Sequence, residues 1–430
     1  MENLDRRLLL AGAGLAGAAA LSKLAHAGPL NPPVGVVAST GKTTQEMFDR
    51  LDKTLALMPL VAPYVTVGAG GGVTINNKGS YYLPSNLTVT SGAAITVNAD
   101  CQINLNGFMI DASATNSAVV AGPGGPRVSV FGGRIMGTGT QGAGTSPLVD
   151  LRSAIRADFF DVYSSFSGGV HVAAGDLNGD GCTFQGSGTG ADQVQCQSGT
   201  INNCTFSSPA GRAIAQVAVA GATLLPNRLI VSRCNIISPV GNAIELLSPG
   251  IVHECTIGPR NGGGNLSAAN GIVLNGGGIV SDCAIDQCGQ FGIVGMGRMP
   301  RIENNRIFGC GMGGILVRDS ATIATSGALI EGNHCGGSSA VNAVGIKIAA
   351  AVQPGGNNGH LVTSNYCTQN WRNLEIGAAF NFAFSNRLAF QGGGGHTLFG
   401  ANVAYGPAVA GSGDLSLIPN ALQFGTNLTF

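Results

Sequence analysis

Short apolar segments separated by Gly, Asn and Ser fill most of the chain after residue 65, and from residue 182 they follow one repeating pattern. A tripeptide that ends on an apolar residue or a cysteine returns about every 20–30 residues. Self-similarity at this period is typical of a solenoid, whose repeats bury their apolar faces only against their neighbours. The tripeptides begin at Cys182, Cys204, Cys234, Cys255, Cys283, Asn305, Asn333, Asn365 and Asn386.

Each repeat predicts three short strands. The first is the tripeptide, the second is a Gly-Ile-x-Val-like segment such as residues 314–317, and the third is the apolar run before the next tripeptide, such as residues 250–254. Alternation with a period of two points the first and third tripeptide residues inward and the middle one to solvent. Inward asparagines in successive repeats should then form a ladder of side-chain amides. The pattern predicts an all-β parallel solenoid.

Three earlier segments resemble a known group of proteins. They are Gly-Ser-Tyr-Tyr-Leu at residues 79–83, Asn-Leu-Asn-Gly-Phe-Met-Ile at 104–110 and Val-Ser-Val-Phe-Gly-Gly-Arg-Ile at 128–135. They are similar to the first coils of exported bacterial β-helix proteins of the pectin-lyase-like superfamily. The resemblance implies a right-handed parallel β-helix over most of the chain. It implies no single activity, because this fold carries lyases, hydrolases, epimerases, phage spikes and adhesins.

Residues 1–27 predict an export signal. Arg6 and Arg7 precede a mildly apolar stretch, and Ala-His-Ala at residues 25–27 offers a small-x-small cleavage site. This arrangement resembles a twin-arginine signal, and an ordinary secretory signal is the alternative. Export would place the mature chain in the periplasm, on the cell surface or outside the cell.

Three further segments follow the signal. Residues 28–64 predict a linker and a short helix, because a capping box at residues 43–46 precedes apolar residues at helical spacing up to about residue 57. This helix would cap the first coil, since the open end of a solenoid exposes its core. Residues 65–405 form the predicted β-helix, and residues 406–430 form a C-terminal cap or tail.

The charge balance narrows the choice of partners. Lys and Arg number 22 and Asp and Glu number 22, so the formal net charge is zero. We therefore expect no nucleic-acid partner, which would call for a basic surplus. No long apolar segment follows the N-terminal one, so we expect no membrane span in the mature chain. The sequence leaves the oligomeric state open.

The eleven cysteines share a few positions of the repeat. Five begin tripeptides, and Cys288 with Cys310, like Cys335 with Cys367, occupy equivalent positions of neighbouring repeats. Cysteines in phase stack at strand spacing inside a solenoid, so we expect buried free thiols rather than disulfides. Twin-arginine export would fit, because that route moves chains already folded in a reducing cytoplasm. A zinc site is the alternative, although no C-x-x-C pair occurs.

The catalytic signatures that the resemblance implies are missing. The Asn-Thr-Asp, Asp-Asp and Gly-His-Gly signatures of polygalacturonase-type hydrolases do not occur, nor does the Asp-Pro-His of alginate-epimerase-like enzymes. Residues 298–301 match the start of a pectate-lyase Arg-x-Pro-x-x-Arg run, but Glu303 stands where the last Arg belongs.

Residues 176–181 match the opening of a calcium loop, whereas Ser187 occupies the position that needs a carboxylate. The simpler interpretation is a Gly/Asn turn between strands. We therefore expect no cofactor or bound metal and keep calcium as the alternative.

The middle residues of the tripeptides form the best candidate site. They change from small and neutral to large and reactive at residue 306, so that Arg, His, Tyr and Arg lie on four successive repeats. A uronate lyase needs a cation for the substrate carboxylate, a base for the C5 proton and an acid for the leaving oxygen. A glycoside hydrolase needs two carboxylates, which this set lacks. The predicted catalytic residues are Arg306, His334, Tyr366 and Arg387.

Insertions after the second strand could add a binding wall, because loops on a rigid solenoid often carry binding sites. Trp371 is either a platform for sugar stacking or an aromatic buried at a coil corner. The other predicted substrate-binding residues are Arg318, Asp319, Asn357, Asn358 and His360.

Two functions remain open from the sequence. The first is an exported β-helix that binds or processes polysaccharide, with lyase chemistry on a uronic-acid polymer ahead of hydrolysis. The second is a non-catalytic surface, structural or adhesin-like β-helix, because polar exposed sheet faces are ordinary. A pairing of Arg306 or Arg387 with Glu303 or Asp319 would favour the second.

Overall fold

The structure is a computed structural model, and its described part belongs to one compact unit, Leu57–Phe430. This part consists of strands and turns without a helix, so it holds no apolar helix long enough to span a membrane. The predicted export signal, the capping helix and most of the tail at residues 406–430 lie outside it. The described residues are 58–59, 66–67, 70–138, 146–218, 228–259, 269–320, 322–338, 340, 343–349, 352, 359–368, 370, 372–376, 382–384, 386–389, 403–405 and 428–429.

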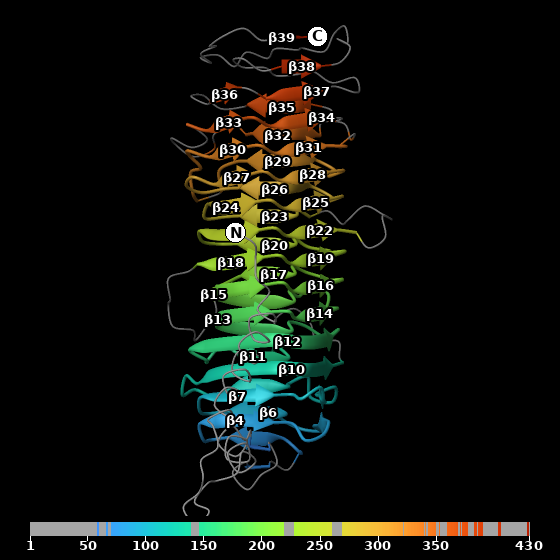
Figure 1. Ribbon diagram of the computed structural model, residues 1–430, viewed down its shortest axis with the longest axis vertical. Coiled ribbons are helices and arrows are strands. Elements are labelled where there is room, and N and C mark those ends of the chain that lie inside the picture. Colours follow the sequence, from blue (N-terminus) through green and yellow to red (C-terminus); the bar gives the residue numbers. More distant parts are fainter. Residues whose placement is uncertain are drawn as a thin grey trace, which may run out of the picture. The chain divides into compact units, whose positions relative to one another are not determined.

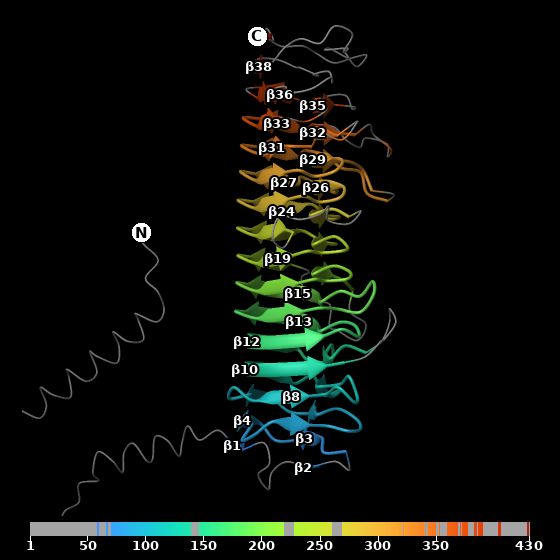
Figure 2. The same cartoon turned by 90° about the vertical axis from the view of Figure 1, so that its right-hand side faces the viewer.

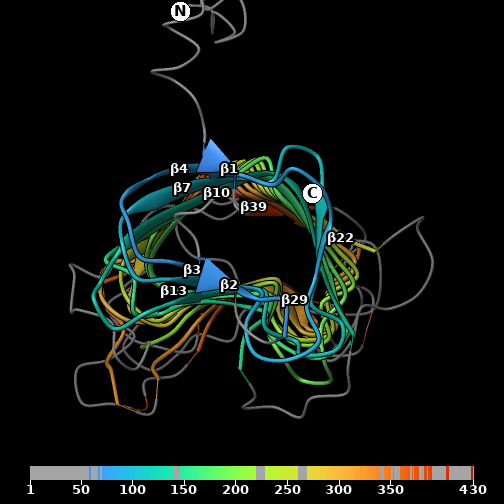
Figure 3. The same ribbon diagram turned by 90° about the horizontal axis from the view of Figure 1, so that it is seen from below.

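Successive coils stack along one axis, with each strand beside its equivalents in the coils before and after (Figure 1, Figure 2). Among the described strands every pairing is parallel except that of β2 with β3. The strands fall into three sheets, which surround the core when the coils are viewed along their axis (Figure 3). The prediction of an all-β parallel β-helix is confirmed.

The first sheet contains the tripeptide strands and, before them, two strands of the irregular N-terminal coils. Its members are β5 (Leu87–Thr88), β8 (Met109–Asp111), β14 (Thr183–Gln185), β16 (Thr205–Ser207), β19 (Asn235–Ile237), β22 (Thr256–Gly258), β25 (Ala284–Asp286), β28 (Arg306–Phe308), β31 (His334–Gly336), β34 (Tyr366–Thr368), β37 (Arg387–Ala389), β38 (Val403–Tyr405) and β39 (Leu428–Thr429).

The second sheet contains the Gly-Ile-x-Val-like strands. Its members are β2 (Thr66–Val67), β3 (Val73–Ile75), β6 (Ile95–Val97), β9 (Val119–Ala121), β11 (Val149–Leu151), β17 (Ile214–Gln216), β20 (Ile244–Leu246), β23 (Ile272–Leu274), β26 (Phe291–Gly295), β29 (Gly313–Val317), β32 (Val344–Ile348) and β35 (Arg372–Ile376).

The third sheet contains the strands that precede each tripeptide. Its members are β1 (Met58–Pro59), β4 (Gly79–Tyr82), β7 (Cys101–Asn104), β18 (Leu229–Ser232), β21 (Gly250–His253), β24 (Gly278–Ser281), β27 (Arg301–Glu303), β30 (Leu329–Glu331), β33 (Leu361–Thr363) and β36 (Phe382–Phe384).

Four longer strands cross from one sheet to the next. β10 (Arg127–Gly137) and β12 (Arg156–Phe166) run from the third sheet into the first, and β13 (Val172–Asp180) and β15 (Val194–Asn202) run from the second into the third. The prediction of a turn between strands at residues 176–181 is wrong for its first five residues. They lie in β13, whose backbone pairs with β15 and is therefore used for the sheet.

A left-handed residue makes the corner between the third and the first sheet. The chain turns sharply there, and a positive φ lets it do so within one residue. This φ lies between 52° and 67° at Gly181, Asn203, Arg233, Glu254, Asp282, Asn304, Gly332 and Ser364. The next residue in each coil is the inward Cys or Asn that begins the tripeptide, which we call the corner residue.

The corner residues confirm both predicted ladders. All eleven cysteines are free and buried, among them the five at corners, and burial raises the pKa of Cys101 in β7 and of Cys196 in β15 to about 12. Asn333 accepts hydrogen bonds from the backbone N–H and the side-chain amide of Asn305, at 3.0 and 2.9 Å. Asn365 accepts from Asn333 in the same way, at 2.9 Å for both bonds. The amides therefore continue from coil to coil through the core.

Candidate functional site

The four predicted catalytic residues lie in one outward column of the first sheet. Each is the first residue of its strand, on β28, β31, β34 and β37. The pairing aligns Arg306 with His334, His334 with Tyr366, and Tyr366 with Arg387. Neighbouring strands are ~4.8 Å apart, so these positions follow one another along the coil axis. We call this column the stripe; the side chain of Arg387 lies outside what the structure describes.

Aromatic contacts organise the stripe. The rings of Phe308 and His334 meet edge to face with centroids 4.6 Å apart, and those of His334 and Tyr366 are 4.7 Å apart. The guanidinium carbon of Arg306 lies 5.0 Å from the Phe308 ring centroid, within cation–π range. The contacts place a cation, an imidazole and a phenol next to one another on the protein surface.

Arg306 does not make the local pairs that would mark the stripe as structural. Glu303 pairs with Arg301 at 2.7 Å. The carboxylate of Asp319 accepts hydrogen bonds from the backbone N–H groups of Thr325 and Val352, at 2.8 Å each. Within the described residues Arg306 forms no ion pair, so its charge is available to a ligand.

His334 has the electrostatics of a base at neutral pH. Partial burial and the nearby charge of Arg306 both lower its pKa from the usual 6.5, because each disfavours the imidazolium. Its Nε2 atom is buried and has no hydrogen-bond partner among the described residues. The imidazole is therefore neutral near pH 7 and has a nitrogen that can accept a proton.

A groove of about 480 Å³ adjoins the stripe on the first sheet. The outward positions equivalent to the stripe carry small residues in the preceding coils, such as Thr256. Their short side chains leave the surface hollow there. The polar lining of the groove includes Asn235, Asp286 and Gln287, and Phe308 forms the wall toward the stripe. Phe308 thus contacts the groove on one side and Arg306 and His334 on the other.

The groove was missed at the sequence level, although a signal for it exists. Alternation makes the residue after each tripeptide point outward, like the middle one. In the four coils along the groove this residue is Ile237, Gly258, Asp286 or Phe308, and the pairing of β25 with β28 aligns the last two. Applying the alternation one residue farther would have found them.

Two of the predicted loop residues are buried and organise loops rather than line a groove. Asp319 is 6% exposed and accepts hydrogen bonds from backbone N–H groups of its own loop and of the insertion in the next coil, as given above. His360 is fully buried, its Nδ1 accepts a hydrogen bond from the backbone N–H of Ala328 at 2.9 Å, and burial lowers its pKa to about 4. Two of these contacts, Asp319 with Val352 and His360 with Ala328, join residues 33 and 32 positions apart, which local pattern does not reveal.

The remaining predicted binding residues do not join the stripe. Arg318 is exposed but follows β29 of the second sheet, and it does not line the groove of the first sheet. Asn357, Asn358 and Trp371 lie outside the described residues. Across the part of the chain that is described, no cluster of three or more His, Cys, Asp or Glu residues is placed to hold a metal ion.

Comparison with known proteins agrees with this architecture. A family model for the right-handed β-helix region matches residues 168–353. The chain is a right-handed parallel β-helix protein. No curated protein sequence matches the β-helix.

Some solved structures are similar to the chain at low identity and with TM-scores below 0.5. Tailspike protein 3 of bacteriophage CBA120 is 13% identical with a TM-score of 0.46 over 81% of the β-helix chain, which spans 59% of that tailspike. A mannuronic acid specific family 6 polysaccharide lyase from human gut microbiota is 12% identical with a TM-score of 0.42, over 79% and 83% of the two chains. A mutant tailspike of E. coli bacteriophage HK620, in complex with pentasaccharide, is 14% identical with a TM-score of 0.42, over 86% and 70%. At these identities and TM-scores the likenesses assign no activity to this chain.

Proposed function

We propose that the protein binds a polysaccharide along the outer face of the first sheet and cleaves it by β-elimination at a uronic acid unit. The observation that carries the proposal is the continuity of the groove with the stripe. Phe308 lines the groove and contacts both Arg306 and His334. A sugar chain in the groove would therefore reach the side chains that acid–base chemistry requires.

The proposed roles follow from the chemistry of each group. The guanidinium of Arg306 neutralises the substrate carboxylate, which makes the neighbouring C5 proton more acidic. The imidazole of His334 takes that proton, the electron pair forms the C4=C5 double bond, and the C4–O bond breaks. The hydroxyl of Tyr366 protonates the leaving oxygen, and a return proton transfer from His334 to Tyr366 restores both groups. Arg387 would bind a neighbouring carboxylate.

Elimination accounts for the groove better than hydrolysis does. The usual glycosidase mechanism needs two carboxylates that flank the scissile bond. The residues that line the groove include a single carboxylate, Asp286. In the lyase mechanism Asp286 would instead bind sugar hydroxyl groups, together with Asn235 and Gln287.

A non-catalytic, adhesin-like role is the second candidate. The groove offers amide and hydroxyl groups, from Asn235, Gln287 and Thr256, that suit binding without reaction. In both cases the partner is a polysaccharide. Export to the periplasm, cell surface or medium is part of the proposal and rests on the signal-like residues 1–27.

A panel of uronic-acid polymers tests the proposal. We expect purified protein to produce new ultraviolet absorbance from unsaturated chain ends with at least one polymer. His334→Ala and Tyr366→Phe should each lower the rate by about 10²–10⁴-fold, the usual contribution of a general acid or base. Absence of new absorbance with every polymer would rule out the lyase assignment, and retained glycan binding would then support the adhesin-like role.

Tyr163→Phe is a matched control. Tyr163 occupies the same outward column of the first sheet, aligned with Thr183 near the other end of the β-helix. It does not line the groove. Loss of its hydroxyl should leave the rate unchanged, and an equal loss in both tyrosine variants would contradict the role of Tyr366.

A further inference from the structure

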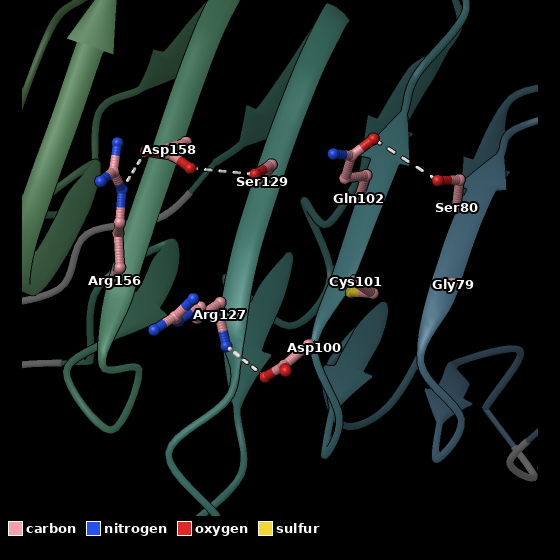
Figure 4. Close-up of a pocket in the computed structure, with 9 residues that line it drawn as sticks. All are labelled: Gly79, Ser80, Asp100, Cys101, Gln102, Arg127, Ser129, Arg156 and Asp158. Atoms are coloured by element: carbon pink, nitrogen blue, oxygen red, sulfur yellow. Dashed lines mark hydrogen bonds and ion pairs between the residues drawn. The ribbon is translucent and has the colours of Figure 1, made fainter.

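A second hollow lies on the third sheet, among the N-terminal coils. Its volume is about 440 Å³, within the ~300–1,000 Å³ of small-ligand sites. Strands β4, β7, β10 and β12 form it, and Figure 4 shows its lining. We propose that this hollow binds an acidic saccharide unit and that Arg127 holds its anionic group.

A row of charged residues borders the hollow. Lys78, Asp100, Arg127 and Arg156 occupy equivalent positions of four successive coils, as the register of the strands that follow them shows. Asp100 is already paired, because its Oδ2 lies 2.9 Å from Nζ of Lys78 and its Oδ1 accepts the backbone N–H of Arg127 at 3.0 Å.

The second acidic residue of the hollow is occupied as well. The carboxylate of Asp158 pairs with Nε of Arg156 at 2.9 Å. It also accepts hydrogen bonds from the hydroxyl of Ser129 and the amide of Asn178, at 3.1 Å each. Both carboxylates of the hollow therefore have partners from the protein itself.

Arg127 is the cation that remains. Within the described residues its guanidinium forms neither a hydrogen bond nor an ion pair. It is exposed, and its side chain extends toward the strand that carries Arg156 (Figure 4). With the other charges matched in pairs, the hollow has one positive charge in excess.

The register adds a second, independent observation. Arg127 and Arg156 lie directly opposite each other on β10 and β12. Asp158 pairs with Arg156 alone, which leaves the neighbouring Arg127 without an acidic partner from the next coil. An anion bound at this point would face the Arg127 guanidinium, and a guanidinium binds oxyanions through two parallel hydrogen bonds.

The rest of the lining selects a sugar over other anions. Ser80, Gln102 and Ser129 form a polar row along the floor, spaced by ~4.8 Å from strand to strand. The hydroxyl of Ser80 donates to Gln102 at 3.4 Å, which leaves the Gln102 amide free to donate. Such a floor matches a ligand with several hydroxyl groups beside its charge.

This site is separate from the stripe. It lies on the third sheet at β4 to β12, whereas the stripe lies on the first sheet at β28 to β37. Its existence does not depend on the proposed lyase activity. The two sites could bind different stretches of one acidic polymer.

Calorimetric titration with a uronate trisaccharide tests the proposal. The titration uses the full chain carrying His334→Ala and Tyr366→Phe. These changes remove the proposed base and acid of the stripe, so the binding measured does not depend on the proposed lyase activity. In this chain Arg127→Gln should weaken binding by about 10-fold or more, as expected for a lost hydrogen bond to a charged group. Added salt should also weaken binding, because the site is exposed.

Arg301→Gln is a control for the loss of an exposed arginine from the same sheet. Arg301 lies on the same sheet and pairs with an acid two residues later, as Arg156 does, and the two side chains are 52% and 53% exposed. It does not line the hollow. Its replacement should change the affinity less than 2-fold.

Three results would overturn the proposal. One is equal weakening by Arg127→Gln and Arg301→Gln, and another is equal binding of a neutral trisaccharide of the same length. The third is binding of inorganic phosphate as tight as that of the uronate, which would reveal a simple anion site. Arg127→Lys keeps the charge without the fork and should give an intermediate affinity, and unchanged thermal unfolding confirms that each variant folds.

Discussion

The coils with a cysteine corner and the coils with an asparagine corner follow the same backbone path, but different hydrogen bonds stabilise it. In the cysteine coils the thiol is placed to donate to a carbonyl two residues earlier and, in several coils, to one of the preceding coil, as Cys234 does to Ser232 at 3.4 Å and to Ile201 at 3.7 Å. In the asparagine coils the amide of Asn333 bonds to both neighbouring coils and to the carbonyl of Ile302, at 2.8 Å. Bonds to sulfur are weak, so the amide corners are held more firmly.

The outer surface changes at the same point of the chain. Thr183 and Thr256 are typical of the outward residues next to cysteine corners, whereas Arg306, His334 and Tyr366 each follow an asparagine corner directly. A site for acid–base chemistry needs side chains held within a fraction of an ångström. The amide ladder lies immediately behind the stripe and is the part of the core that can provide this rigidity.

Removal of one amide should produce the largest difference between the two regions. Asn333→Ala leaves the backbone N–H of Asn305 and the carbonyl of Ile302 without these partners in the core. Each unsatisfied buried group costs ~1–3 kcal/mol, so we expect a loss of about 4 kcal/mol in the free energy of unfolding. Urea denaturation measures it.

The matching change in a cysteine coil is Cys234→Ala. It removes one buried sulfur and its weak hydrogen bonds, and should lower the free energy of unfolding by only about 1 kcal/mol. Asn333→Cys should fall between the two. Equal losses for Asn333→Ala and Cys234→Ala would show that the two kinds of corner are equivalent.

Acid should weaken both regions through a buried histidine in each. Burial lowers the pKa of His171 and of His360 from 6.5 to about 4, so the folded state binds fewer protons than the unfolded state between these values. The stability that each contributes is complete above pH 6.5 and is lost as the pH falls to 4. The loss should reach about 3 kcal/mol per histidine.

Histidine-selective NMR titration checks this prediction. The two rings should stay neutral in folded protein down to about pH 4, while the urea midpoint falls over the same range. The pKa of His171 is low because its ring is completely buried beside Phe166 and Phe184. This burial outweighs the hydrogen bonds of the ring with Ser164 and with the Gly186 carbonyl. Titration of either ring near pH 6.5 would contradict the burial.

The left-handed residue before each corner offers a smaller test. Glu254→Gly in a cysteine coil should raise the free energy of unfolding by about 0.5 kcal/mol, because glycine adopts φ of 53° without strain. Its exposed contact with His253 contributes little. The reverse change in an asparagine coil, Gly332→Ala, should destabilise, since its Cβ would lie 2.3 Å from Oδ1 of Asn304. Thermal unfolding of both variants should therefore shift in opposite directions.

The substitution expected to change the free energy of unfolding least lies in the stripe itself. Arg306→Gln removes a charge that lowers the pKa of His334, so this pKa should rise toward its usual value. NMR titration of His334 measures the shift. The comparable change in the N-terminal coils, Arg134→Gln, lies in the same column and should leave His334 unaffected. An equal shift in both variants would show that the effect is not local.

Alternation along the repeat was sufficient to order the stripe. The sequence placed Arg306, His334 and Tyr366 in one column, and the register agrees. The groove could have been found by the same argument applied one residue farther. The hollow at Arg127 could not, because β10 and β12 cross a corner without a break and the N-terminal coils lack the tripeptide that marks the register later in the chain.

Burial of the loop residues was also beyond local pattern. Asp319 and His360 are residue types that often bind ligands. In the structure Asp319 instead bonds to Val352 and His360 to Ala328, and these contacts hold loops together. Insertions of different length separate these partners, so no fixed period relates them. The calcium-like residues 176–180 show the same limit, since pairing with β15 places them in a strand.

The sequence by itself determined the solenoid, the two ladders and the order of the outward side chains. It could do so because each coil contacts only the coils beside it, so a local period carries the long-range pairing. Only the tertiary structure decided which polar groups are exposed, where the surface is hollow and which charges remain unpaired. Those properties depend on the sizes and partners of side chains from three or four coils at once, and no single repeat contains that information.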